Sequence, residues 1–140
     1  MDAQRMLRAM LRVVGSVSAL AIVAVFMPRA WMAACHEWLG LGPLPGGPIV
    51  EYLARSTSMF YAILGGVQWA LSSDVRRYAR AIMALGGATL VCGLILLTID
   101  LRAGLPAWWI VAEGPFVMVL GLVNLVLAAK VRATAGNALG

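Results

Sequence analysis

Residues 81–99 read AIMALGGATLVCGLILLTI and contain no charged residue. As an α-helix, rising about 1.5 Å per residue, this stretch nearly matches the hydrocarbon core of a bilayer, which is about 30 Å thick. Three other apolar stretches of similar length share the chain. The pattern therefore predicts an all-α integral membrane protein, with helices at about 7–27, 49–71, 78–99 and 107–130.

The composition excludes a water-soluble domain of this size. Hydrophobic residues make up 62% of the 140 residues and charged residues 12%, and the mean hydropathy is +0.90. A soluble domain carries about twice that charged share, and one small core cannot bury so much apolar surface. We expect residues 1–140 to form a single transmembrane domain, a four-helix bundle.

The basic residues are divided unevenly between the two ends of these helices. With the N-terminus inside, positive charge is concentrated on the cytoplasmic side, which predicts that both termini are cytoplasmic. The cytoplasmic residues are Arg5, Arg8, Arg12, Arg76, Arg77, Arg80, Lys130 and Arg132, against Arg29, Arg55 and Arg102 outside. Because these charges lie between apolar runs and not on a soluble fold, the net charge of +5 does not predict nucleic-acid binding.

The basic loop of Arg76, Arg77 and Arg80 follows the second predicted helix. Anionic headgroups attract such a loop by about 1 kcal/mol per basic residue. Membrane lipid is the partner that this loop predicts.

The first outer loop, residues 28–48, divides into two parts. Its first half favours a short helix in the membrane interface, anchored by Trp31 and Trp38, and its second half is a Gly/Pro run that opposes regular structure. Pro48 suits the first position of the following helix. A signal peptide is the alternative interpretation of the first apolar run, but Pro28 and Arg29 separate that run from the small residues before Cys35.

Several charged residues of the outer half belong to apolar stretches: Glu51, Arg55, Asp100, Arg102 and Glu113. A charge at the centre of a membrane helix costs about 2.5–3.5 kcal/mol on insertion scales, and less near its edge. Glu51 and Arg55 stand four apart on one helix face, which suits an ion pair. Asp100 opposes the dipole at the end of its helix, so we expect Arg102 or Arg55 beside it. These five residues are the predicted outer-facing polar site.

Glu113 precedes Gly114 and Pro115, and two interpretations stay open. Pro115 bends a continuous fourth helix next to a cavity, or the helix begins at Pro115. Glu113 then lies in an interfacial turn with Trp108 and Trp109, which are predicted interface anchors.

No complete catalytic or metal-binding pattern is present in the sequence. Cys35, His36 and Glu37 are adjacent, and neighbours on a helix point about 100° apart, so they converge poorly on one metal ion. No glycine-rich phosphate loop and no HExxH or GxSxG motif occurs. We expect no metal and no cofactor.

Small residues recur every four positions on two of the predicted helices. They are Ala62, Gly66 and Ala70 on the second and Ala84, Ala88 and Cys92 on the third. Such stripes permit close helix contact in lipid, within one bundle or between copies. We expect a homo-oligomer or a larger membrane complex.

Residues 99–109, IDLRAGLPAWW, with the later Glu113-Gly114-Pro115, and residues 52–56 and 73–78 resemble a pattern in small four-helix proteins of the bacterial inner membrane. The resemblance covers most of the chain and implies that location, without an activity.

Three functions stay open from the sequence. The first is a self-associating or accessory subunit of a membrane complex. The second is a carrier or channel for a small solute or ion that uses the outer acids. The third is a lipid- or quinone-linked enzyme with Glu113 or Asp100 as acid or base; because nothing in the sequence completes such a site, a non-enzymatic function is favoured.

Overall fold

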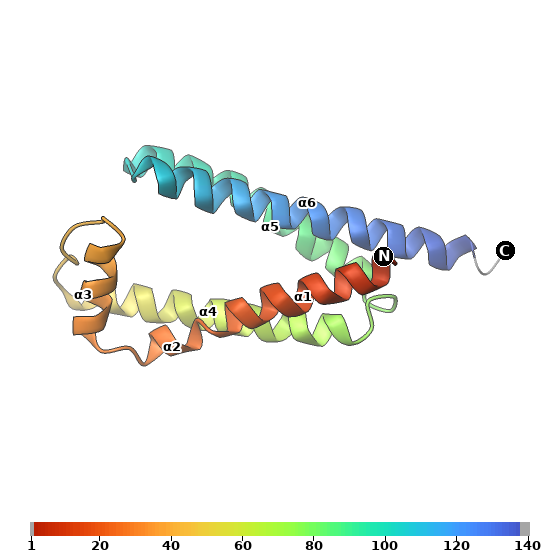
Figure 1. The fold of residues 1–140 in the computed structure, drawn as a ribbon, viewed down its shortest axis with the longest axis horizontal. Helices are drawn as coiled ribbons and strands as arrows, with labels where there is room; N and C mark the ends of the chain where they lie inside the picture. The colour runs from red at the N-terminus through yellow and green to blue at the C-terminus, as the bar shows by residue number, and fades with distance from the viewer. Residues whose placement is uncertain (1, 138–140) are drawn as a thin grey trace. The chain divides into compact units, whose positions relative to one another are not determined.

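The computed structural model describes residues 2–137, which form an all-α chain (Figure 1). Three helical stretches are long and apolar enough to cross a membrane: Ala3–Val25, Ala79–Ala103 and Ala107–Thr134. The membrane class is thereby supported. The helices are α1 (Ala3–Ala19), α2 (Ile22–Val25), α3 (Arg29–Trp38), α4 (Pro48–Ser73), α5 (Ala79–Ala103) and α6 (Ala107–Asn137).

Helix α4 is long enough to span a bilayer but is not among those three stretches. It carries Glu51 and Arg55 near its start and Ser56, Thr57 and Ser58 directly after Arg55, which lowers its hydropathy. Its crossing, the four-helix bundle and the cytoplasmic termini stay predictions. The chain divides into two compact units, the first of residues 1–11 and 71–140 and the second of residues 12–70.

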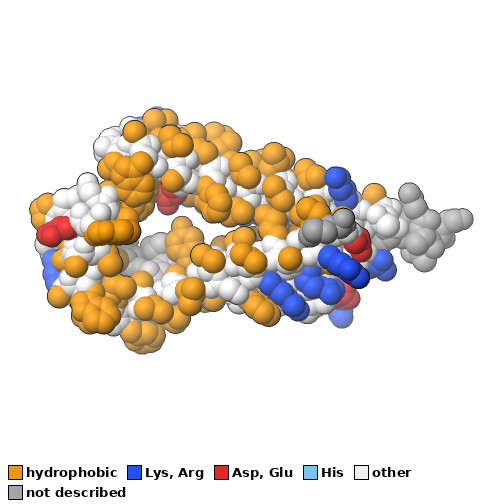
Figure 2. All heavy atoms as spheres, in the orientation of Figure 1, with side chains coloured by type: hydrophobic (Ala, Val, Ile, Leu, Met, Phe, Trp, Pro, Cys, Tyr) orange, Lys and Arg blue, Asp and Glu red, His pale blue; other side chains and the backbone are white. Residues whose placement is uncertain are grey.

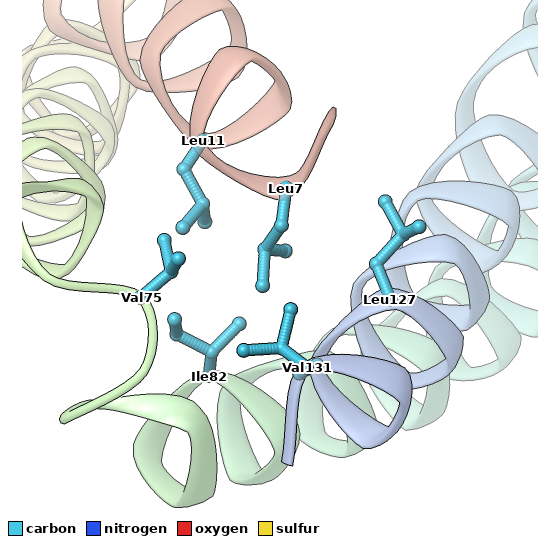
Figure 3. Close-up of a cluster of buried hydrophobic side chains, with 7 residues drawn as sticks. Leu7, Leu11, Val75, Ile82, Leu127 and Val131 are labelled. Atoms are coloured by element: carbon cyan, nitrogen blue, oxygen red, sulfur yellow. The ribbon is translucent and has the colours of Figure 1, made fainter. Parts of the chain in front are cut away.

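The hydrophobic core of the first unit lies where the start of α1, the 74–78 turn and the ends of α5 and α6 meet (Figure 3). The buried members are Leu7, Leu11, Val75, Ile82, Leu127, Ala128 and Val131. The same end of this unit carries exposed basic residues, seen as blue spheres among mainly apolar surface in Figure 2: Arg5, Arg8, Arg76, Arg77, Arg80, Lys130 and Arg132.

Helices α5 and α6 form an antiparallel hairpin whose contact face has a seven-residue period. Two helical turns return nearly to the same face after seven residues. The contact positions are 79, 86, 93 and 100 on α5 and 107, 114, 121 and 128 on α6, which read Ala, Gly, Gly, Asp and Ala, Gly, Gly, Ala. All of them are buried except 107.

The glycines let the two backbones touch. A Cβ atom added to Gly121 would lie 2.7 Å from the carbonyl oxygen of Gly86, and one added to Gly93 would lie 2.8 Å from that of Gly114. In each pair the two residues are equally far along the sequence from the turn at 103–104. A single alignment of the two helices therefore pairs the contact positions of α5 with those of α6. In lipid, where no hydrophobic force drives helices together, such close contact is a main source of their association.

Two local motifs close the ends of α5. Before it, the Asp74 Oδ1 atom accepts hydrogen bonds from the backbone N–H groups of Arg76 (3.2 Å) and Arg77 (3.1 Å), so Asp74 caps a helical turn. After it, Gly104 adopts φ = 66°, and its N–H and that of Leu105 turn back to the Asp100 carbonyl. This left-handed helix end suits glycine.

In the second unit, α1 packs on α4 through another glycine pair. A Cβ atom on Gly65 would lie 2.5 Å from the Gly15 carbonyl oxygen and 2.6 Å from the Ala19 nitrogen. Nearby, the Trp69 Nε1–H donates a hydrogen bond to Ser16 Oγ (3.1 Å). Past Ala19 the helix gives way to a turn, where the Ala21 N–H bonds to Ser18 three residues back.

Two features of the structure decide between the alternatives that the sequence left open. Helix α6 runs through Pro115 and begins at Ala107, so a fourth helix that begins at Pro115 is wrong. At the start of α6, the backbone N–H groups of Trp109 and Ile110 donate hydrogen bonds to the Pro106 carbonyl oxygen, so the first helical turn is already formed before Pro115. The contact of α5 with α6 does not use the predicted stripe of Ala84, Ala88 and Cys92. It uses the face of Gly86 and Gly93, which lets the two backbones approach more closely.

Candidate outer polar site

Glu51 and Arg55, in the first two turns of α4, join a cluster with Arg29 of α3. Glu51 Oε1 lies 2.7 Å from Arg29 Nη1, and its Oε2 lies 3.7 Å from Arg55 Nη2. Arg55 also donates hydrogen bonds to the carbonyl oxygens of Val25 (2.6 Å) and Met27 (3.1 Å). Arg55 therefore satisfies carbonyls left open at the end of α2, and Glu51 is neutralised by two cations.

Helix α3 is an amphipathic segment with exposed tryptophans. The side chains of Trp31 and Trp38 are 66% and 85% exposed, which suits contact with headgroups. His36 donates an Nδ1 hydrogen bond to the Gly42 carbonyl oxygen (2.7 Å), which ties the helix end to the Gly/Pro run. Within residues 2–137, no three His, Cys, Asp or Glu side chains gather as a metal site would require.

Asp100 occupies the last buried position of the α5 contact face and is 3% exposed. By the glycine register it lies level with Ala107, the first residue of α6, where the positive end of a helix dipole favours a carboxylate. Its Oδ2 atom still has no hydrogen-bond partner in the described structure. Arg102 is exposed one half-turn away, and no ion pair joins it to Asp100 among the described residues.

Glu113 lies on α6, half-buried, within a candidate membrane span. Its Oε2 atom accepts a hydrogen bond from Trp109 Nε1, one helical turn earlier. The rings of Trp108 and Trp109 stand at 60° with centroids 5.3 Å apart. Together with Ala112 and Glu113 they line a shallow, open surface pocket of about 260 Å³ on α6.

The structure thus divides the predicted site residues into four settings. Glu51 and Arg55 form an ion-paired cluster in the second unit. In the first unit Asp100 is buried in a helix contact, Arg102 is exposed, and Glu113 lies beside Trp109 at the shallow surface pocket.

Sequence reasoning missed three polar residues. Arg29 pairs with Glu51 and completes that cluster. The sequence feature that could have indicated this pairing is an arginine at the start of the predicted interfacial helix. Asn124 and Gln68 are 5% and 6% exposed, and each has a side-chain oxygen without a hydrogen-bond partner. Polar residues within apolar runs were the available signal for these two.

Comparisons with protein-family models, with curated proteins and with solved structures find no match to this chain.

Proposed function

We propose that this protein is a self-associating subunit of the bacterial inner membrane, with both termini in the cytoplasm. The observation that carries the proposal is the surface of α5. Ala84, Ala88 and Cys92 are all exposed and lie about 150° around the helix from the glycine face that contacts α6. Small residues in lipid permit close approach of another helix, and a second copy supplies an identical stripe.

The proposal predicts that bulk on this stripe separates the copies. In mild detergent the native chain is expected to have the mass of an oligomer, and Ala88→Leu that of a monomer. Leu94→Phe is the control, since Leu94 is exposed on another face of α5. Because every copy shares one orientation, Cys92 is expected to meet Cys92 of a second copy, and oxidation of a Cys35→Ser variant in membranes would cross-link them. A monomeric native chain would overturn the proposal.

The orientation carries its own prediction. Seven basic residues gather at one end of the first unit, which favours a cytoplasmic location for that end. Cys35 is exposed on α3, so a Cys92→Ser variant is expected to react with a membrane-impermeant maleimide from outside intact spheroplasts. Ala133→Cys, placed near the end of α6 in a variant lacking both native cysteines, should react only after permeabilisation. The reverse labelling pattern would show the opposite orientation.

A carrier for a small solute is the second candidate, favoured by the buried, unpartnered Oδ2 atom of Asp100. Ionisable residues within membrane helices often mark substrate or ion pathways. Solute uptake into proteoliposomes, compared with Asp100→Asn, tests this candidate. Equal uptake by the two proteins would remove it.

A further inference from the structure

We propose that Trp108, Trp109 and Glu113 form a binding site for an organic ammonium ion on α6. The site goes beyond self-association, and it lies on a different helix from the proposed contact stripe. Either proposal can therefore fail alone.

The first argument is the uncompensated charge of Glu113. Its only hydrogen-bond donor in the described structure is Trp109 Nε1, and no Lys or Arg among the described residues pairs with it. An ionised carboxylate in a membrane segment is costly without a partner. A bound cation would supply the missing positive charge, while the hydrogen bond from Trp109 holds the carboxylate at the edge of the surface pocket.

The second argument is the shape and lining of this surface pocket. It is shallow and open to its surroundings, with a volume of about 260 Å³, which leaves room for a small substituted ammonium. Trp108 is half exposed and its ring meets that of Trp109 at 60°, so the two indoles offer surfaces in different planes. The faces of tryptophan rings attract cations more strongly than those of other aromatic side chains.

The donor set decides which kind of cation fits. Calcium takes six to eight oxygen ligands and magnesium near-octahedral oxygen geometry, whereas this lining offers one carboxylate among indole and methyl groups. A weakly hydrated ammonium with alkyl substituents needs few oxygen ligands and gains from aromatic contact. The amine of a lipid headgroup and a free organic cation share this chemistry.

The test uses choline and its neutral isostere 3,3-dimethylbutanol as probes of the full-length protein in non-ionic detergent. Tryptophan fluorescence is expected to change with choline and not with the alcohol. Glu113→Gln should weaken choline binding at least tenfold, and Trp108→Phe should weaken it several-fold. Glu37→Gln is the matched control, because Glu37 is an exposed acid next to exposed Trp38, and it should bind choline as the native chain does.

Two lipid arms distinguish the sources of the ammonium group. In vesicles of phosphatidylglycerol alone, choline should bind as in detergent. If phosphatidylethanolamine vesicles suppress that binding, the headgroup amine occupies the site, and if they do not, a free cation is the ligand. Either result supports an ammonium site. Equal binding of choline and the alcohol, or unchanged binding by a Glu113→Gln variant with native circular dichroism, would overturn it.

Discussion

Gly121→Val is expected to destabilise the α5–α6 hairpin by about 3 kcal/mol or more, at the upper end of the usual cost of overpacking. A Cβ atom at this position would lie 2.5 Å from the Leu90 nitrogen, 2.7 Å from the Gly86 carbonyl oxygen and 2.9 Å from the Leu90 Cα. All three are backbone atoms. No rotamer change relieves such contacts, so the helices must separate and lose contact along their length.

The matched control for this prediction is Gly87→Val on α5, because a Cβ atom there would meet nothing within 4 Å. Surface substitutions of this kind stay within about 0.5 kcal/mol. The free energies of unfolding can be compared by SDS titration from detergent micelles, with tryptophan fluorescence as the signal. Equal losses in the two variants would show that α5 and α6 do not pack through Gly121.

Asp100→Ala is expected to stabilise the protein by about 1–2 kcal/mol. A buried polar atom without a partner costs about 1–3 kcal/mol, and Asp100 Oδ2 is such an atom. Against this, a carboxylate near the start of α6 gains only about 0.3–1 kcal/mol from the helix dipole. Alanine also matches Ala79, which holds the equivalent place at the other end of the contact face.

The same SDS titration measures this gain, and Asp100→Asn separates its causes. Asparagine keeps an unpartnered polar group of equal size in the contact, so it should stabilise less than alanine does. A loss of stability in Asp100→Ala would mean that the carboxylate has a stabilising partner. If the alanine variant is more stable but loses a transport activity, Asp100 is retained for function at the expense of stability.

Hydropathy predicted the positions of the helices because a bilayer demands long apolar segments whatever they pack against. The predicted 78–99 segment compares with α5 at Ala79–Ala103, and the predicted 107–130 segment with α6 at Ala107–Asn137. The largest difference is at the first helix, which was predicted at about 7–27. The observed helix α1 starts at Ala3 and ends at Ala19, and the short helix α2 follows at Ile22–Val25. No glycine or proline at Leu20 and Ala21 signals that turn.

The contact faces were harder to predict, because a stripe on one helix does not reveal which face meets a neighbour. Four-residue spacing singled out Ala84 and Ala88, whereas the hairpin packs through Gly86 and Gly93. The signal becomes visible only when both helices are considered together. Each helix carries two glycines seven residues apart, and the two pairs are placed symmetrically about the turn between the helices. The Trp109 bond to Glu113 follows from i,i+4 spacing, but whether a carboxylate gains a cationic partner depends on tertiary placement.

The glycine period also limits how this protein can move. Sliding α5 along α6 by one turn would carry Leu90 toward a level now occupied by glycine, and the next matching register is seven residues, or about 10.5 Å, away. Such a slide must break every close contact before any reforms. Helix pairs that shift in small steps lack this barrier. The close glycine contacts therefore oppose any motion in which α5 slides along α6 by less than seven residues.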